Sequence, residues 1–96
     1  MPTLLPHRTP RSLHEPGKAL WTELTHIHDY SGTHLRLLFV LCQAVDQQTD
    51  LREVIDREGP TYIAPSGIVK VRPEISLEQA TVRTIAKLSR QLEIPA

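Results

Sequence analysis

The sequence predicts a mainly α-helical fold: a helical hairpin with a long central helix, then a short β-hairpin and a C-terminal helix, in chains that assemble as an oligomer such as a ring. Apolar residues make up 40% of the 96 residues but aromatic residues only 4%, so the core must be built from Leu, Ile, Val and Ala, the usual filling of packed helices. In three segments these residues recur at steps of three and four, the helical period. Oligomerisation often stabilises chains this short.

The chain is expected to begin with a flexible basic arm, residues 1–11, followed by a single helical domain, residues 12–96. Three prolines among the first ten residues oppose regular structure. Ser12 and Glu15 match the S-x-x-E capping box, so the first helix should begin between Ser12 and Lys18. Its buried face is predicted to comprise Leu20, Trp21, Leu24 and Ile27 or His28.

Gly32 is expected to end the first helix in a left-handed conformation, with Ser31 or Thr33 capping the next. That second helix should run from Thr33 to Glu58, about 39 Å at the helical rise. Gly59 and Pro60 would end it. A break between residues 47 and 50 is the alternative, because Asp50 could cap a new helix there.

The long helix carries two apolar stripes and therefore needs two partners. Residues 37–42 are apolar all round, which a second helix of a small monomer could hardly cover. We therefore expect a neighbouring subunit to cover part of this helix. One stripe includes Leu35, Leu38, Cys42 and Val45; the other includes Gln48 and the predicted oligomer interface, which consists of Leu37, Leu41, Ala44, Leu51 and Ile55.

Two short β-prone runs, residues 61–63 and 68–71, flank Ala64-Pro65-Ser66-Gly67 and predict a β-hairpin. Because an isolated hairpin is marginally stable, it should lie on the helices or on a copy of itself. A last helix starts at Pro73 or is capped by Ser76 with Gln79, and ends before Pro95. Its predicted buried face comprises Leu77, Ala80 or Thr81, Ile85, Leu88 and Leu92.

No catalytic site, metal site or cofactor is expected, and the chain is predicted not to be an enzyme. The single cysteine, Cys42, lies in the most apolar turn, where burial suppresses the reactive thiolate. His26 and His28 point to different faces of a helix, and no carboxylate or cysteine completes a site with His34. The carboxylate pairs Asp46 with Asp50 and Glu53 with Asp56 are predicted to be a solvated helix surface, and no phosphate-binding loop motif occurs.

Charge is distributed unevenly although the net charge is zero. Residues 1–18 and 61–96 each carry a net charge of +2, whereas residues 19–60 carry −4. Arg83, Lys87 and Arg90 form a basic stripe on the last helix, which could equally be ordinary solvated surface. No apolar run approaches the length of a membrane span.

With this layout, the chain resembles the phage terminase small subunits. The resemblance covers nearly the whole chain, and the order and spacing of its segments carry it. These segments are Pro16-Gly17-Lys18-Ala19-Leu20-Trp21, residues 38–46 with Cys42-Gln43-Ala44-Val45-Asp46, Glu58-Gly59 before a hairpin with Ser66-Gly67 at its tip, Arg72-Pro73, and Leu92-Glu93-Ile94-Pro95.

The resemblance implies a non-catalytic homo-oligomer, in the cytoplasm of the bacterial host, that binds double-stranded phage DNA and recruits or regulates the large terminase subunit, the ATPase and nuclease. Contacts should be chiefly to phosphates, with little base readout. On this interpretation, reversing the charge of Asp46 or Asp50 should strengthen DNA binding or leave it unchanged. The expected DNA-binding residues are Arg8, Arg11, Lys18, Lys70, Arg72, Arg83, Lys87 and Arg90.

The alternative function is a helical protein-interaction or regulatory adaptor, encoded in a prophage or satellite element, without a packaging role. Adjacent genes for a large terminase subunit and a portal would favour packaging over this alternative.

Overall fold

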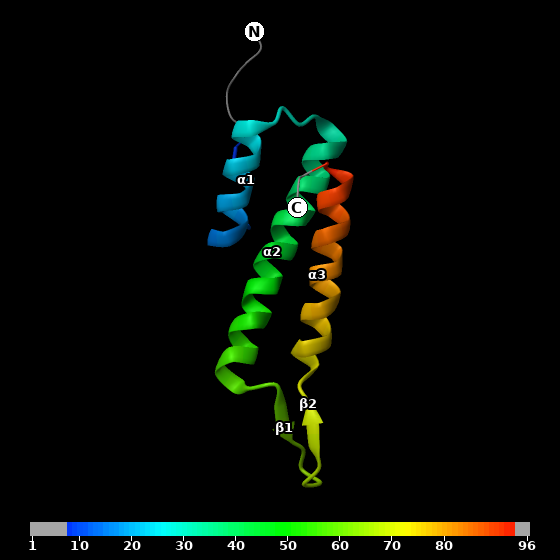
Figure 1. Ribbon diagram of the computed structural model, residues 1–96. Helices are drawn as coiled ribbons and strands as arrows, with labels where there is room; N and C mark the ends of the chain where they lie inside the picture. Colours follow the sequence, from blue (N-terminus) through cyan, green and yellow to red (C-terminus); the bar gives the residue numbers. More distant parts are fainter. Residues whose placement is uncertain (1–7, 94–96) are drawn as a thin grey trace.

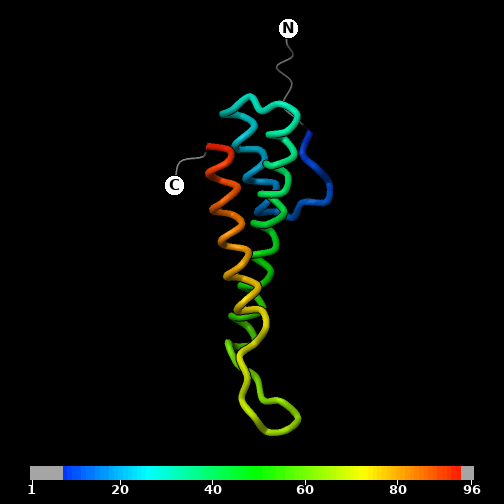
Figure 2. The backbone as a smooth tube through the Cα atoms, turned by 90° about the vertical axis from the view of Figure 1, so that its right-hand side faces the viewer, coloured from blue at the N-terminus to red at the C-terminus, as the bar shows by residue number. Residues whose placement is uncertain are grey.

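The computed structural model describes residues 8–93, which fold into three helices and one antiparallel β-hairpin. The described part is elongated, about 65 Å long and 24 by 19 Å across, with the hairpin at one end of the helices (Figures 1 and 2). The expected mainly α-helical fold is confirmed. The elements are α1, Glu15–Ile27; α2, Gly32–Glu58; β1, Thr61–Ile63; β2, Val69–Val71; and α3, Pro73–Gln91.

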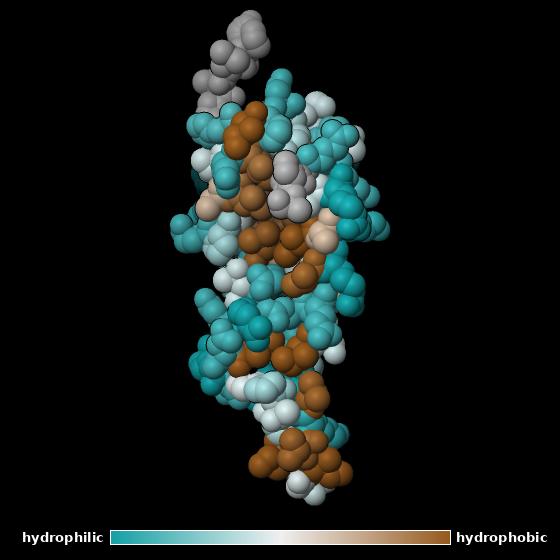
Figure 3. Space-filling model, in the orientation of Figure 1, coloured by the Kyte–Doolittle hydropathy of each residue, from teal (hydrophilic) through white to brown (hydrophobic). Residues whose placement is uncertain are grey.

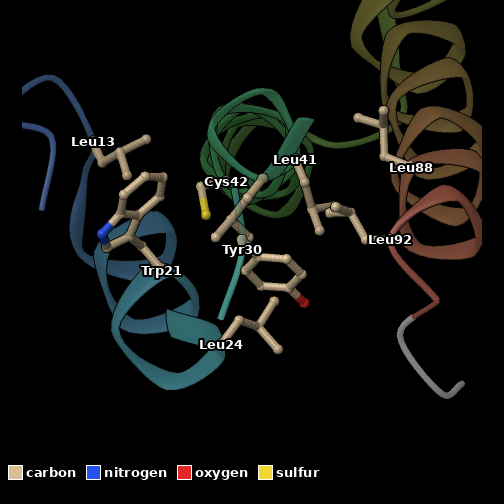
Figure 4. Packing of buried hydrophobic residues seen from close by; sticks show 9 residues of the cluster. Leu13, Trp21, Leu24, Tyr30, Leu41, Cys42, Leu88 and Leu92 are labelled. Atoms are coloured by element: carbon tan, nitrogen blue, oxygen red, sulfur yellow. The ribbon is translucent and has the colours of Figure 1, made fainter. Parts of the chain in front are cut away.

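α2 is one unbroken helix, so the alternative of a break between residues 47 and 50 is excluded. Its two apolar stripes both find partners within the chain, because α1 and α3 pack against it from different sides (Figure 1). Cys42 lies beside Trp21 of α1, and Leu41 points toward Leu88 and Leu92 at the α3 side (Figure 4). Burial of an aliphatic side chain such as Leu41, which is 1% exposed, contributes roughly 1.5–3 kcal/mol.

Both ends of α1 differ from the sequence prediction. α1 begins at Glu15, within the predicted window, but its N-cap is His14 and no side chain of its own caps it, so the Ser12 capping box is wrong. Gly32 does not end α1: it is the first residue of α2, and the glycines with positive φ in the described residues are Gly59 and Gly67. An extended link after Ile27 instead brings Tyr30 into the core.

The buried face of α1 also ends earlier than predicted. Trp21 and Leu24 are buried, whereas Ile27 is 65% exposed and His28 is exposed as well. Tyr30, from the link, closes the core at this level, beside Leu24 (Figure 4). The last turn of α1 therefore needs no apolar contact of its own.

The β-hairpin forms as predicted, with Gly67 at a φ of +86° in its turn and Gly59 at +87° at the end of α2. These left-handed conformations favour glycine. The second strand starts at Val69, one residue later than expected. The hairpin does not lie on the helices but extends beyond their ends (Figure 1), and the space-filling view shows its apolar surface at this end (Figure 3).

α3 begins at Pro73, as predicted, and Arg72 occupies the N-cap position. Its buried residues are Thr81 and Leu88, and Leu92 is buried directly after its end, but the prediction of Leu77 on this face is wrong because Leu77 is 49% exposed. Glu78 occupies that level instead: it accepts a hydrogen bond from Gln48 at 2.9 Å and lies 3.4 Å from Arg52. The prediction about Pro95 lies outside the described residues.

Candidate functional site

The fold brings most of the predicted DNA-binding residues into one half of the molecule. The contacts of Glu78 with Gln48 and Arg52 place residue 78 level with the middle of α2. Because α2 and α3 are antiparallel, α3 beyond that point lies along the first half of α2, as does α1 (Figure 1). We call residues 8–47 and 79–93 the basic half and residues 48–78 the hairpin half.

The two halves differ in charge. The basic half contains seven Arg and Lys against five Asp and Glu, a net charge of +2, and the hairpin half contains four against six, a net charge of −2. The sequence suggested two basic ends and an acidic middle, but the chain folds back at the hairpin and unites the basic ends. The predicted DNA-binding residues in the basic half are Arg8, Arg11, Lys18, Arg83, Lys87 and Arg90.

These six residues keep their charges available. Within residues 8–93, none of them forms an ion pair; the pairs that do form involve His14, Arg52 and Arg57. Lys18 is half-buried and the other five are at least partly exposed. An exposed, unpaired cation can approach a phosphate without first losing an internal partner.

Lys70 and Arg72, by contrast, lie at the hairpin, away from the other predicted DNA-binding residues. The Arg72 guanidinium is engaged within the chain: its Nε donates to the carbonyl of Gly59 at 2.9 Å, and it lies over the Tyr62 ring, 5.7 Å from the centroid. Its Nη2 also donates to the carbonyls of Glu58 and Thr61, at 3.4 Å each. Arg72 therefore fixes the base of the hairpin to the end of α2.

The N-terminal segment is attached to the helices by Leu13, which is 2% exposed and lies beside Trp21 (Figure 4). A turn precedes it, in which the Leu13 amide donates to the Pro10 carbonyl at 3.4 Å. Arg8 and Arg11 are exposed on either side of Pro10. The predicted flexible arm is thus tied down at its junction with the domain, while its first seven residues lie outside the described part.

Asp46 overturns the prediction of a solvated carboxylate. It is 6% exposed, and its carboxylate accepts hydrogen bonds from the backbone amides of His14 and Gly17, each at 2.7 Å. Both amides lie at the N-terminus of α1, where unpaired N–H groups attract negative charge. A side chain of α2 thus caps α1. Reversing the charge of Asp46 would place a buried cation at the N-terminus of α1, so it would disturb the fold as well as the surface charge.

Gly17 makes this close approach possible. A Cβ atom at this position would lie 2.6 and 2.8 Å from the two Asp46 carboxylate oxygens and 2.8 Å from the carbonyl oxygen of Cys42. Sequence patterns do not reveal the pair, because its two members are 29 residues apart. The only local signal is the glycine directly after Pro16 in a helical first turn, where another residue would favour the helix more.

The predicted oligomer interface is largely used within the chain. Leu41, Ala44 and Ile55 are buried in the single chain, and Leu37 and Leu51 are partly buried. α3 therefore covers the apolar stripe that was predicted to need a neighbouring subunit. A subunit interface on this stripe stays a prediction, and the two partly buried leucines are its accessible members.

The most exposed apolar surface instead lies on the hairpin. Pairing of Thr61 with Val71 and of Ile63 with Val69 puts these four side chains on one face. Ile63 is 73%, Val69 64% and Val71 63% exposed. The opposite face carries Tyr62 and Lys70. We call Thr61, Ile63, Val69 and Val71 the apolar hairpin face.

The remaining titratable groups offer little for catalysis. Burial, and secondarily the charge of Asp46, raises the pKa of the Cys42 thiol to about 12, which confirms the prediction of core packing. Burial also raises the pKa of Tyr30, which lines a cavity of about 290 Å³ with His28 and His34. Within residues 8–93, no three His, Cys, Asp or Glu side chains are grouped to hold a metal ion.

Among the described residues, no helix combines the length and apolarity needed to cross a membrane.

Comparison with known families gives one match. A family model described as "Phage terminase, small subunit" matches residues 18–94, a span that covers α2, α3, the hairpin and nearly all of α1. No curated protein and no solved structure matches the chain.

Proposed function

Since the chain belongs to the phage terminase small subunits and so has a role in phage DNA packaging, we propose that it binds double-stranded DNA through its basic half and recruits or regulates the large terminase subunit. In this proposal the chain itself is not an enzyme and acts in the host cytoplasm. The observation that carries the DNA-binding role is the union of both basic chain ends in one half of the fold, with six exposed or half-exposed cations free of ion pairs within residues 8–93.

Assembly of several copies would strengthen this surface. One basic half with a net charge of +2 is a weak electrostatic ligand, because each neutralised phosphate releases only about one counterion. Several copies on one DNA would add their contacts at high effective concentration. We therefore propose that the functional form is a homo-oligomer. The apolar hairpin face and the partly buried Leu37 and Leu51 are the surfaces that support protein contacts.

DNA binding is tested by removing two charges from each half. Arg83→Ala with Lys87→Ala, or Arg8→Ala with Arg11→Ala, should weaken binding to any sequence and flatten the dependence of log K on log salt by about 0.9 for each lost phosphate contact. The matched control, Arg57→Ala with Lys70→Ala, removes the same charge from the hairpin half and should change the slope little. Fluorescence anisotropy with labelled duplexes over a salt series measures both quantities.

The outcome of the control also locates the surface. Equal losses from both halves would contradict the basic half as the DNA-binding surface and restore Lys70 to it. If the Arg83 and Lys87 changes preserve affinity but abolish stimulation of the large subunit, the stripe on α3 is a partner surface instead. Undetectable binding at low salt would leave the chain with protein contacts alone.

A further inference from the structure

The junction between the N-terminal segment and the helices is held at two neighbouring residues, Leu13 and His14. Leu13 is buried beside Trp21. His14 donates its backbone amide to Asp46 at 2.7 Å, and its imidazole Nδ1 lies 3.6 Å from Asp50 Oδ2 at the surface. Arg8 and Arg11 precede these residues, and Lys18 follows them by less than two helical turns. The positions of Arg8, Arg11 and Lys18 relative to α2 therefore depend on this junction.

Asp46 is unusual because it caps a helix other than its own. A Ser, Asp or Asn at the N-cap would satisfy the same amides locally and would fix only the helix that contains it. Here the acceptor comes from the middle of α2, 32 residues from His14 and 29 from Gly17. The two bonds therefore fix the segment and α1 relative to α2, to which α3 is also packed.

Burial of this carboxylate is costly unless both oxygens are paired, and each oxygen accepts one of the two amides. The approach also requires Gly17, whose missing Cβ leaves room for the carboxylate. The junction is thus a specific arrangement of an acid, a glycine and two amides, in addition to apolar packing.

We propose that Asp46 is the positioning residue of the DNA-binding surface: it holds Arg8, Arg11 and Lys18 in place relative to the rest of the basic half, so that DNA meets an ordered set of cations. This inference rests on the proposed DNA-binding function. An ordered surface binds better than a mobile one because the cost of ordering it is not taken from the binding energy.

The decisive variant is Asp46→Asn, which keeps the shape of the side chain and removes its charge. Simple electrostatics predicts that losing a negative charge strengthens DNA binding. Positioning predicts the opposite: binding about tenfold weaker, as expected when the segment occupies its bound position about a tenth of the time. The matched control is Glu53→Gln, an exposed residue of the same helix, which should leave affinity unchanged or slightly higher.

A double-mutant cycle separates positioning from general destabilisation. If Asp46 acts through the N-terminal cations, Asp46→Asn should cost little further affinity when Arg8, Arg11 and Lys18 are already alanine. All affinities are measured at a temperature at which circular dichroism shows each variant folded. His14→Pro removes one of the two amides without changing Asp46, and proline suits the His14 φ of −85°. Because it also removes the imidazole, whose Nδ1 lies 3.6 Å from Asp50 Oδ2, the control is His14→Ala, which keeps the amide and should leave DNA affinity nearly unchanged. His14→Pro should also weaken DNA binding, and it tests the proposal even if Asp46→Asn fails to fold.

Limited trypsin digestion measures the position of the segment without DNA. In Asp46→Asn or His14→Pro, cleavage after Arg11 should be about tenfold faster, while cleavage after Lys70 should not change. No acceleration at Arg11 would overturn the inference whatever the DNA affinity. Faster cleavage with unchanged DNA affinity, or with losses that add in the cycle, would overturn it as well. If Arg8→Ala with Arg11→Ala alone leaves DNA binding intact, the proposed DNA contact of this segment fails, and the inference fails with it.

Discussion

At the scale of single residues, the pair of Gly17 and Asp46 shows how a tertiary contact decides a residue's role. Sequence patterns treat Gly17 as a weak point of a helix and Asp46 as surface. In the folded chain both are buried, and the hydrogen bond between the Gly17 amide and the Asp46 carboxylate is 2.7 Å long. The same carboxylate also adds to the raised pKa of Cys42, one helical turn away on α2.

Gly17→Ala is expected to destabilise the chain by about 1–3 kcal/mol, although alanine is the better helix former by about 1 kcal/mol. The clash decides the sign, because one of the atoms in the way is the backbone carbonyl oxygen of Cys42, at 2.8 Å. Urea unfolding measures the change.

Gly32→Ala is the control for this change. Gly32 is also at the start of a helix, a Cβ atom added there would meet no heavy atom within 4 Å, and its φ is not positive. The substitution should be neutral or stabilising by up to about 1 kcal/mol. Equal effects of the two substitutions would contradict the close approach at Gly17.

At the scale of elements, the hairpin is the element whose side chains are least covered by the rest of the chain. Its strands have three residues each, and every strand residue is exposed. Its base is fixed by Arg72, whose guanidinium contacts backbone carbonyls at the end of α2 and the start of β1. The apolar hairpin face therefore keeps its place without cover from the helices.

Val69→Lys tests whether this face mediates assembly. Val69 is 64% exposed, so the substitution should leave helix content and the unfolding free energy nearly unchanged. If assembly uses the face, light scattering should show a lower mass at the same concentration. Ser66→Lys, at the exposed turn of the hairpin, adds the same charge and should leave the mass unchanged. Equal masses for all three proteins would exclude this face from the interface.

At the scale of the whole molecule, charge and apolar surface are separated along the long axis. The basic half has a net charge of +2, and the hairpin half has −2 and carries the apolar hairpin face. This separation suits a molecule that meets an anionic polymer with one half and proteins with the other.

The purified chain is accordingly expected to show neither ATP hydrolysis nor DNA cleavage, with or without divalent metal ions. Its sequence contains no phosphate-binding loop motif, and the raised pKa of Cys42 keeps its thiol protonated at neutral pH. Phosphate release and plasmid nicking assays measure the two activities. Either activity would contradict this prediction if a point substitution in the chain abolished it.

Local sequence patterns determined where the helices and strands begin and end. Residue spacing, Gly59-Pro60, the turn with Gly67 and Pro73 predicted α2, the hairpin and the start of α3 to within about a residue, because these signals act through neighbouring residues. The apolar turn at residues 37–42 likewise placed Cys42 in the core. The family resemblance also followed from the order of such segments.

Only the tertiary structure decided which helices cover the two stripes of α2, where the basic residues meet, and what Asp46 and Arg72 do. Each depends on contacts between residues distant in sequence: α3 returns along α2 and buries Leu41, and α1 brings Gly17 to Asp46. A local pattern records that a residue is apolar or charged, but the partner that buries or pairs it is set by how the helices pack. For this reason the sequence predicted a neighbouring subunit where α3 lies, and solvent where Asp46 caps α1.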